Sequence, residues 1–387
     1  MKFKDKVIFI ISYENWGAMR MSKHHYAIEL GKAGNKVYFI NHPDKRYELR
    51  RGEVRVLETD AINVFEVKHR LFYPYFLKFK ANWLYNLTIS WHIRKIIKAV
   101  GFYPEIVWSF DTGNTIPLRY FPKSELRILM PVDGPFGHKH EMRAVKGADV
   151  IISVTERILS VFKKFPIPGL LVNHGVAQVF LDDHVNGVAN DKIRIGYSGS
   201  LVRNDLDTKC FLHLVKSHPD KIFEFWGEND FRKSNMHLPQ DVSRETLKFL
   251  ETLKSMPNVV MHGPVSSETL ALGLKKMDCL FLCYSIKNDQ NHHKVLEYLG
   301  TGKAIVSNHL SSYKDAASDL LVMAQSTDNN DAFPKLFDAV VKDLGFYNSK
   351  DKQEVRKKYA RQFSYAENIR RIETFVNDHV KTAQSGR

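Results

Sequence analysis

Hydrophobic residues in the first third of the chain gather in short continuous runs, with amphipathic segments between them. The run KVIFIIS at 6–12 has the composition of a buried strand, SKHHYAIELGKAG at 22–34 has helical spacing, and KVYFIN at 36–41 is a second apolar run. Further strand candidates are NVFEV, IVWSF, RILMPV and VIISV. Continuous apolar strands that alternate with helices are typical of a parallel sheet covered on both faces. The pattern therefore predicts a doubly wound α/β domain.

A polar, Asn/Asp/Gly-rich segment near residues 181–191 interrupts this pattern and is typical of a linker. The pattern then restarts with the strand and Gly turn KIRIGYSGS, and apolar strands again alternate with helices. We therefore expect two α/β domains in tandem, at 1–183 and 184–365. The last segment, 366–387, has helical periodicity, and we expect it to cross back to the first domain.

Composition excludes several classes of protein and points to an anionic partner. Charged residues are 26% of the chain, with 21 Gly and 14 Pro, so disordered, collagen-like and coiled-coil classes are excluded. Lys and Arg number 57 against 43 Asp and Glu, a net charge of +14, which suits nucleic acid, phospholipid or a phosphorylated small molecule. Three cysteines without CxxC spacing indicate a reducing compartment. The apolar run Val7–Ile11 is too short for a signal segment or a membrane span, so we expect a cytoplasmic location.

Cations and aromatic residues are concentrated, without any acid, between residues 67 and 100. Aromatic rings together with cations suit a lipid headgroup interface. The alternative is that the rings belong to an ordinary core and the lysines to a solvated face. The cations are Lys68, Arg70, Lys78, Lys80, Arg94, Lys95 and Lys98, and the rings include Phe72, Tyr73, Tyr75, Phe76, Phe79, Trp83, Tyr85 and Trp91.

The segment DQNHHKVLEYLGTGKAIVSN at 289–308 carries the densest candidate chemistry. Asp289 and Glu297 have seven residues between them, and Glu297 lies on a predicted short helix that follows the Asp289 loop. The free amides of a helix start suit a diphosphate, and Lys294 adds a mobile positive charge there. Ionised carboxylates can accept hydrogen bonds from sugar hydroxyls. The alternative is that the two acids only decorate the surface and that Gly302 only ends the helix.

The segment KVLEYLGTGKAIVS resembles the donor-site signature of GT-B glycosyltransferases, particularly the retaining, family-4-like enzymes with an E-x7-E pattern. Here the pattern is D-x7-E, with Asp289 and Glu297 as its acids. The resemblance implies two Rossmann-like domains, in doubly wound parallel sheets, that face a central cleft. It also implies that the second domain binds the nucleotide-sugar donor and the first domain the acceptor.

Weaker resemblances follow in the order seen in that family. IGYSGSLV at 195–202 is similar to the first turn of the nucleotide-binding domain, with Gly199 at the close approach, and FWGEN at 225–229 places Gly227 near the nucleobase. The family's Arg and Lys clamp is replaced by Ser200 and Leu206, so phosphate binding is assigned to Arg203, nearby but out of register, and to Lys294.

On the acceptor side, the family's first loop has two glycines, whereas this chain has Trp16 and Gly17, followed by His24. Gly17 and His24 are accordingly predicted to line the acceptor path. Asp133 in PVDGP stands where such enzymes place a His or Asp that faces the donor sugar, and it is predicted to be catalytic together with Asp289. An ordinary Asp-Gly turn is the alternative for Asp133.

Metal and cofactor patterns find no support in the chain. The histidine pairs lack the spacing of a metal site, and GxGxxG and Walker A patterns do not occur. We expect no cofactor and no metal requirement, because protein cations would neutralise the leaving diphosphate.

The sequence therefore predicts a glycosyltransferase that moves a sugar from a nucleotide sugar to a glycan or lipid-linked acceptor, with retention, in bacterial-type surface polysaccharide synthesis. An anionic membrane surface is a predicted partner of residues 67–100, on the cytoplasmic face. One alternative is a sugar-nucleotide epimerase or hydrolase on the same frame. The other is a basic nucleic-acid-binding protein, although no RRM, KH or helix-turn-helix signature supports it.

Overall fold

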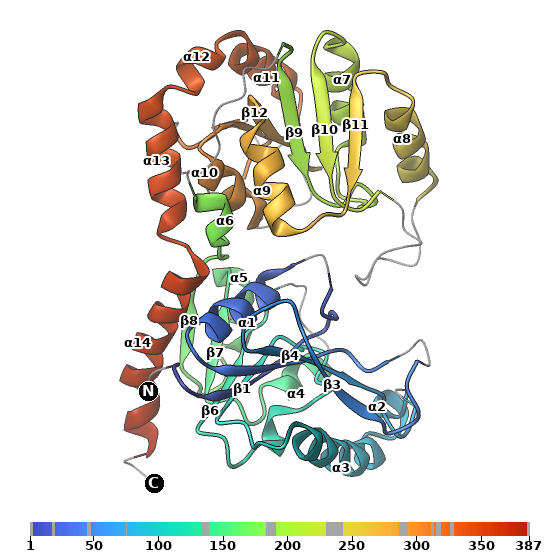
Figure 1. Cartoon of the computed structure of the whole chain (residues 1–387), viewed down its shortest axis with the longest axis vertical. Coiled ribbons are helices and arrows are strands. Elements are labelled where there is room, and N and C mark those ends of the chain that lie inside the picture. The colour runs from blue at the N-terminus through green and yellow to red at the C-terminus, as the bar shows by residue number, and fades with distance from the viewer. Residues whose placement is uncertain are drawn as a thin grey trace. The chain divides into compact units, whose positions relative to one another are not determined.

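The structure is a computed structural model that describes residues 3–17, 20–44, 48–74, 76–132, 139–182, 191–229, 243–285, 293–310, 313–314, 319–325 and 329–384. Contacts divide the chain into two compact units, Met1–Asn173 with Tyr365–Arg387, and His174–Ser364. Each unit is built around one largely parallel sheet with helices packed against it (Figure 1).

The sheet of the first unit has eight strands in the order β3-β4-β2-β1-β5-β6-β7-β8. All neighbours are parallel except β3, which pairs antiparallel with β4 at the edge. Four of the five residues of β1 are buried, as a strand covered on both faces requires. The strands are β1 (Val7–Ile11), β2 (Lys36–Ile40), β3 (Val54–Glu58), β4 (Val64–His69), β5 (Ile106–Ser109), β6 (Leu126–Leu129), β7 (Val150–Ser153) and β8 (Gly169–Leu171).

The last helix of the chain packs into this first unit. Tyr365, at its start, contacts Tyr26 of the first helix with ring centroids 5.0 Å apart, and Asn368 donates a hydrogen bond to the carbonyl of Asn173 at 3.0 Å. The helices of this unit are α1 (Ser22–Lys32), α2 (Leu77–Lys80), α3 (Asn82–Val100), a 3-10 turn (Leu118–Tyr120), α4 (Lys139–Ala144), α5 (Glu156–Phe162) and α14 (Tyr365–Gln384).

The second unit has a six-stranded, all-parallel sheet in the order β11-β10-β9-β12-β13-β14. Asp207, Ser243 and Ser266 each accept a hydrogen bond from a backbone N–H three residues later, and so cap the helices α7, α8 and α9. The strands are β9 (Arg194–Ser198), β10 (Ile222–Trp226), β11 (Val259–Gly263), β12 (Cys279–Leu282), β13 (Ala304–Ser307) and β14 (Val322–Met323). The helices are α6 (Gln178–Leu181), α7 (Thr208–Ser217), α8 (Arg244–Lys254), α9 (Ser267–Lys275), α10 (His293–Thr301), α11 (Phe333–Lys342), α12 (Leu344–Tyr347) and α13 (Lys350–Arg361).

Each strand order reverses once, and that point locates a candidate site in each unit. In the second sheet the chain proceeds outward from β9 to β11 and then returns to the other side of β9 with β12, which is the Rossmann order. In the first sheet the same reversal separates β1 from β5. Ligands of open α/β sheets bind outside the carboxyl ends of the strands at this reversal.

Candidate functional site

The loop after β9 approaches its neighbours too closely for any side chain. Gly199 has a φ of +151°, and a Cβ on it would lie 2.7 Å from Tyr197 Oη and 2.9 Å from Lys294 Cε. Gly227, after β10, has a φ of +125°, and its Cβ would lie 2.3 Å from the carbonyl oxygen of Gly199. Gly199 N–H donates to the carbonyl of Trp226 at 2.7 Å. The two predicted glycines therefore allow the two loops to pack backbone against backbone at the carboxyl edge of the sheet.

Helix α10 brings Lys294 and Glu297 to this loop. Lys294 is half-buried, with Cε against Gly199. Burial lowers the pKa of Lys294, Glu297 opposes this shift, and the charge of Arg203 adds to it. Three cation and carboxylate groups that the sequence assigns to the donor thus influence one another electrostatically within the second unit.

Glu297 is a mostly buried carboxylate with an unusual pKa. Its side chain is 14% exposed, and burial raises its pKa to about 7, although Lys294 works in the opposite direction. His293 Nε2 lies 4.0 Å from Glu297 Oε1. A carboxyl group that ionises near neutral pH can accept hydrogen bonds from hydroxyls once it is charged, and perturbed groups of this kind cluster at functional sites.

Arg203 is held by an acid next to it. Its Nε donates to Asp205 Oδ1 at 2.7 Å, its Nη2 donates to Asp205 Oδ2, and its guanidinium carbon lies 5.8 Å from the centre of the Tyr284 ring. Burial lowers the pKa of Arg203, but the hydrogen bond to Asp205 outweighs it and the net shift is upward. Arg203 is therefore a permanent cation whose charge Asp205 partly neutralises.

Three serines that sequence reasoning missed lie at the ends of strands in this unit. Ser198 ends β9, Ser200 follows it, and Ser307 ends β13. Their buried hydroxyl oxygens have no hydrogen-bond partner among the described residues. Buried polar atoms are nearly always paired, so orphaned hydroxyls at a carboxyl edge indicate a ligand or water. The sequence signal was available, because RIGYS and AIVS each end in a serine.

A tyrosine layer supports the loop from below. Tyr298 Oη accepts a hydrogen bond from the backbone N–H of Ser198 at 2.7 Å, which joins α10 to β9 across 100 residues of sequence. Burial raises the pKa values of Tyr197, Tyr284 and Tyr298, that of Tyr284 to about 12. These hydroxyls therefore stay neutral, and that of Tyr298 acts as a hydrogen-bond acceptor for the loop.

On the first unit, His24 is locked by its own backbone surroundings. It is 1% exposed, Nδ1 accepts from the N–H of Met21 at 3.0 Å, and Nε2 lies 3.0 Å from the carbonyl of Asn15. Burial lowers the pKa of His24 to about 3, so the ring is neutral and Nε2–H is the donor. In this conformation His24 holds the loop that contains Gly17, and it offers neither nitrogen to a ligand.

A buried carboxylate at the reversal of the first sheet was not anticipated. Asp111 follows β5 and is 3% exposed. Its Oδ2 accepts from the N–H groups of Thr115 at 2.5 Å and Ile116 at 3.2 Å, and its Oδ1 has no hydrogen-bond partner among the described residues. The charge of Asp111 opposes the lowering of the Lys78 pKa that burial causes. Asp111 Oδ1 is therefore available to a ligand or water, whereas the ring nitrogens of His24 are occupied.

Two predicted catalytic residues, Asp133 and Asp289, lie outside the described residues. Their roles therefore stay predictions.

Among the described residues no group of three or more His, Cys, Asp and Glu side chains is placed to hold a metal ion. In the described part of the chain, no helix has both the length and the apolar character to cross a bilayer.

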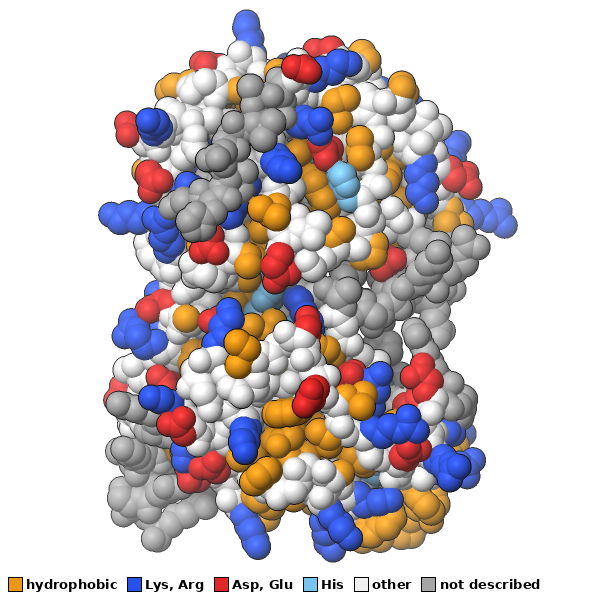
Figure 2. Space-filling model, viewed as in Figure 1, with side chains coloured by type: hydrophobic (Ala, Val, Ile, Leu, Met, Phe, Trp, Pro, Cys, Tyr) orange, Lys and Arg blue, Asp and Glu red, His pale blue; other side chains and the backbone are white. Residues whose placement is uncertain are grey.

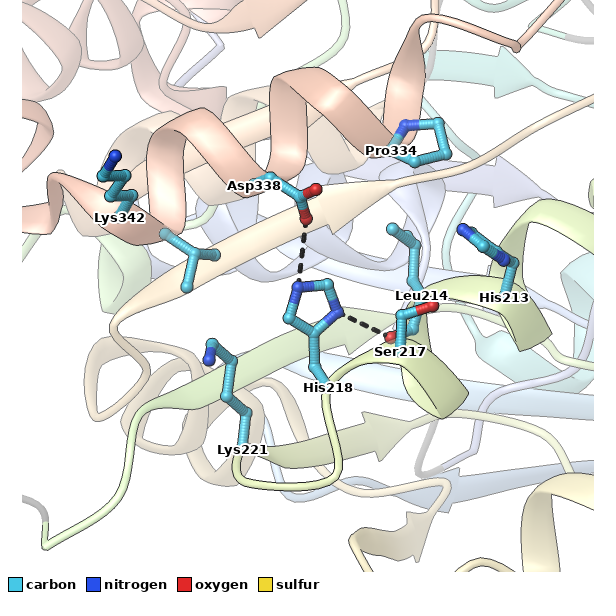
Figure 3. Close-up of a pocket in the computed structure, with 9 residues that line it drawn as sticks. His213, Leu214, Ser217, His218, Lys221, Pro334, Asp338 and Lys342 are labelled. Carbon is cyan, nitrogen blue, oxygen red and sulfur yellow. Dashed lines mark hydrogen bonds and ion pairs between the residues drawn. The ribbon is translucent and has the colours of Figure 1, made fainter.

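Two hollows of the second unit lie away from Lys294 and Glu297. One has a volume of about 330 Å³ between α7 and α11, where His218 contacts Asp338 at 3.0 Å and the carbonyl of Leu214 at 2.9 Å (Figure 3). His218 and Lys221 precede β10, so this hollow is at the amino edge of the sheet. The other hollow, of about 510 Å³, lies over the face of the sheet that carries Glu224 and His262.

No family model and no curated protein matches the chain. Solved structures match it over nearly its whole length. Sucrose-phosphate synthase from Thermosynechococcus elongatus aligns with a TM-score of 0.66 and 10% identity, over 96% of this chain and 98% of that one. HepE of Anabaena, solved with UDP and glucose, has a TM-score of 0.66 and 10% identity, over 96% and 99%. The pneumococcal O-GlcNAc transferase GtfA, solved with UDP and GlcNAc, has a TM-score of 0.59 and 9% identity, over 97% and 99%. The chain has the two-domain GT-B fold of these glycosyltransferases.

Proposed function

We propose that this chain is a glycosyltransferase that moves a sugar from a nucleoside-diphosphate sugar to a glycan acceptor, with the donor held by the second unit. The observation that carries the proposal is the close approach of Lys294, whose charge interacts with that of Glu297, to the Gly199 turn where the strand order reverses. A Rossmann sheet binds nucleotides at this place, and a cation beside a close-packed glycine turn suits a diphosphate.

Each group has a chemical role in this proposal. Lys294 and the turn at Gly199 contact the diphosphate, and Glu297 accepts hydrogen bonds from the ribose hydroxyls when ionised. Arg203, which is hydrogen-bonded to Asp205, also attracts the negatively charged phosphates. The hydroxyls of Ser198 and Ser307 gain partners when a polar ligand or water reaches them.

The transfer breaks the bond between the anomeric carbon and the diphosphate oxygen and forms a bond to an acceptor hydroxyl oxygen, whose proton is released. The bonding electrons leave with the nucleoside diphosphate, so negative charge grows there. Lys294 and Arg203 stabilise this charge, which is the role that we assign to them in place of a divalent metal. Retention of configuration, and donor contacts of Asp133 and Asp289, are part of the proposal.

The ligands of structural neighbours suggest which donor to test first. HepE of Anabaena was solved with UDP and glucose, and the pneumococcal enzyme with UDP and GlcNAc. UDP is therefore the first nucleotide to test for this chain, followed by GDP. Function in surface polysaccharide assembly also belongs to the proposal.

The test is thermal unfolding of the full chain with UDP and with GDP, because a ligand that binds the folded state raises its melting temperature. We expect one of the two to raise it, and we expect Lys294→Met to weaken that nucleotide about 10–100-fold, the typical value of a charge-assisted hydrogen bond.

Lys303→Met is the matched control. Burial also lowers the pKa of Lys303, with Asp278 opposing, but Lys303 follows α10 at the amino end of β13. If neither nucleotide shifts the wild type, or if Lys303→Met weakens binding as much as Lys294→Met, the donor site is wrongly assigned. Loss of the nucleotide sugar without any added acceptor would favour the epimerase or hydrolase alternative.

A further inference from the structure

One surface of the first unit exposes an unusual number of large hydrophobic side chains. Of the fifteen exposed large hydrophobic residues in the described chain, seven lie between residues 72 and 91, and they are 43% to 70% exposed. Figure 2 shows hydrophobic side chains gathered at the lower right, where Figure 1 places α2 and α3, with Lys and Arg among them. We call this set the α2–α3 surface. Its members are Phe72, Tyr73, Phe76, Phe79, Trp83, Leu87 and Trp91.

Helix α3 has two apolar stripes on opposite sides. The first is buried against the unit and contains Tyr85, Ile89, Ile93 and Ile96. The second, Trp83, Leu87 and Trp91, repeats every four residues and begins about 160° away from the first at 100° per residue. It is exposed throughout, up to 70% at Trp83. A helix on the surface of a globular domain normally carries polar residues there, so the second stripe fits a partner other than water.

The segment that carries the α2–α3 surface has charges of one sign only. Residues 67–100 contain seven Lys and Arg and no Asp or Glu. Lys80, Arg94 and Lys98 are exposed, and Arg94 and Lys98 continue the line of Trp83, Leu87 and Trp91 by helical spacing. Lys95 Nζ lies 5.0 Å from the centre of the Trp91 ring. Exposed aromatic rings interleaved with cations along one segment are typical of a surface that inserts rings at the headgroup level of an anionic bilayer.

The α2–α3 surface is fixed to the carboxyl edge of its sheet. Tyr85 Oη donates to the carbonyl of Thr115 at 2.8 Å, and the buried Lys78 lies 3.5 Å from Thr115 Oγ1. Thr115 also donates its N–H to Asp111, at the reversal of strand order. The exposed stripe is therefore attached to the edge where this sheet can hold a ligand, by the buried face of the same helices.

We propose that the α2–α3 surface docks the protein onto an anionic lipid bilayer, with Trp83, Leu87 and Trp91 at the headgroup level and Arg94 and Lys98 against lipid phosphates. A second copy of this chain would bring the same cations face to face, because the same surface meets itself in a two-fold dimer. A nucleic acid would use the cations but would leave Leu87 in water.

Docking has a consequence for the acceptor, and this step rests on the proposed function. An acceptor carried on a lipid would be presented to the edge that contains Asp111, because α2 and α3 are attached there. Vesicle binding is measured without donor or acceptor, so its failure and the failure of the donor site are separate results.

The test is co-sedimentation of the full chain with vesicles of phosphatidylcholine alone and of equal parts phosphatidylcholine and phosphatidylglycerol. We expect sedimentation with the anionic vesicles and little with the neutral ones. Trp83→Gln with Leu87→Gln should weaken binding about tenfold or more, through loss of inserted apolar surface. Arg94→Gln with Lys98→Gln should weaken it about thirtyfold.

Matched controls use exposed residues elsewhere in the first unit. Ile62→Gln with Leu171→Gln removes two exposed hydrophobic residues of the first unit, and Lys123→Gln with Lys146→Gln removes two exposed cations. Both controls should bind as the wild type does, and all variants should keep its melting temperature. A wild type that stays in the supernatant with anionic vesicles overturns the proposal. So does a dimer by light scattering that Trp83→Gln with Leu87→Gln abolishes while vesicle binding persists.

Discussion

The two sheets reverse their strand order in the same way, but they build different surroundings at that point. In the second unit the loop after β9 begins with two small residues, Gly199 and Ser200, and α10 places Lys294 beside Gly199. In the first unit the corresponding region is filled with large side chains that bind one another. His24 stacks on Phe39 with ring centroids 4.8 Å apart, and Arg20 lies 4.1 Å from the Trp16 ring.

The difference shows that topology locates a site while side chains decide its chemistry. Ser198, Ser200 and Ser307 leave hydroxyls without partners in the described part of the second unit, where a polar ligand can satisfy them. In the first unit the ring nitrogens of His24 are already satisfied by backbone. The orphaned atom at the reversal of the first sheet is instead a carboxylate oxygen, Asp111 Oδ1, which suits a hydroxyl group better than an anionic diphosphate.

Gly199→Ala should have the largest effect on turnover, because it disrupts the close contact between the Gly199 turn and Lys294 in the second unit. An alanine Cβ would lie 2.9 Å from Lys294 Cε and 2.7 Å from Tyr197 Oη, and the φ of +151° strains any L side chain. We expect turnover of the nucleotide sugar to fall about 100-fold or more, since a displacement of about 1 Å at a reacting site can cost that much. Steady-state kinetics with UDP-glucose measures it.

Gly101→Ala is its control. Gly101 has a φ of +83°, yet a Cβ on it meets nothing within 4 Å. The variant therefore introduces backbone strain but no steric clash. It should lower the melting temperature and leave turnover unchanged. Equal losses of turnover in the two variants would mean that backbone strain, and not the contact with Lys294, explains the effect.

Glu297→Gln should change the pH dependence of donor binding. Burial raises the pKa of Glu297 to about 7, so the carboxylate that accepts ribose hydroxyls forms as the pH rises through that value. We expect the wild type to bind UDP-glucose about tenfold more tightly near pH 8 than near pH 6, and the variant to lose this dependence. Calorimetric titration across this range measures it. Glu245→Gln, at an exposed position of α8, should keep the wild-type profile.

The same variant should stabilise the folded protein. The pKa of Glu297 in the folded protein exceeds the usual 4.5, so this group ionises at lower pH in the unfolded chain. The folded state is therefore destabilised increasingly as the pH rises from about 4.5 to about 7, and by a constant amount above that. Removing the carboxylate should raise the free energy of unfolding by about 1–3 kcal/mol near pH 8 and by nothing near pH 4. Unchanged stability at both pH values would contradict the buried placement of this group.

The sequence predicted the long apolar strands well and the short or edge strands poorly. The strands β1, β2 and β12 are nearly continuous apolar runs because both their faces are covered. β3 was not predicted. It is an edge strand that pairs only with β4, so much of VRVLE is exposed and its hydrophobic pattern is weak. β8 and β14 have three and two residues, too few for any period to be visible.

For the candidate site, local motifs were informative and distant contacts were not. Local motifs and their resemblance to a known family singled out Gly199, Lys294 and Glu297, and the structure brings Gly199 and Lys294 into contact. The hydrogen bond from the Ser198 N–H to Tyr298 spans 100 residues, which no local pattern encodes. The pairing of Arg203 with Asp205 depends on rotamers, which sequence spacing leaves open.

His24→Gln should have the smallest effect on donor binding, and it tests the other side of the comparison. The neutral ring joins Met21 N–H to the Asn15 carbonyl and stacks on Phe39, and glutamine keeps polar atoms but not the ring. We expect the free energy of unfolding to fall by about 1–3 kcal/mol, the typical cost of buried groups left without partners, with donor affinity unchanged. His213→Gln, at an exposed position of α7, should change neither quantity. Chemical denaturation and UDP-glucose titration of both variants decide the matter, because a loss of donor affinity in His24→Gln at wild-type stability would show that the first unit contributes to the donor site directly.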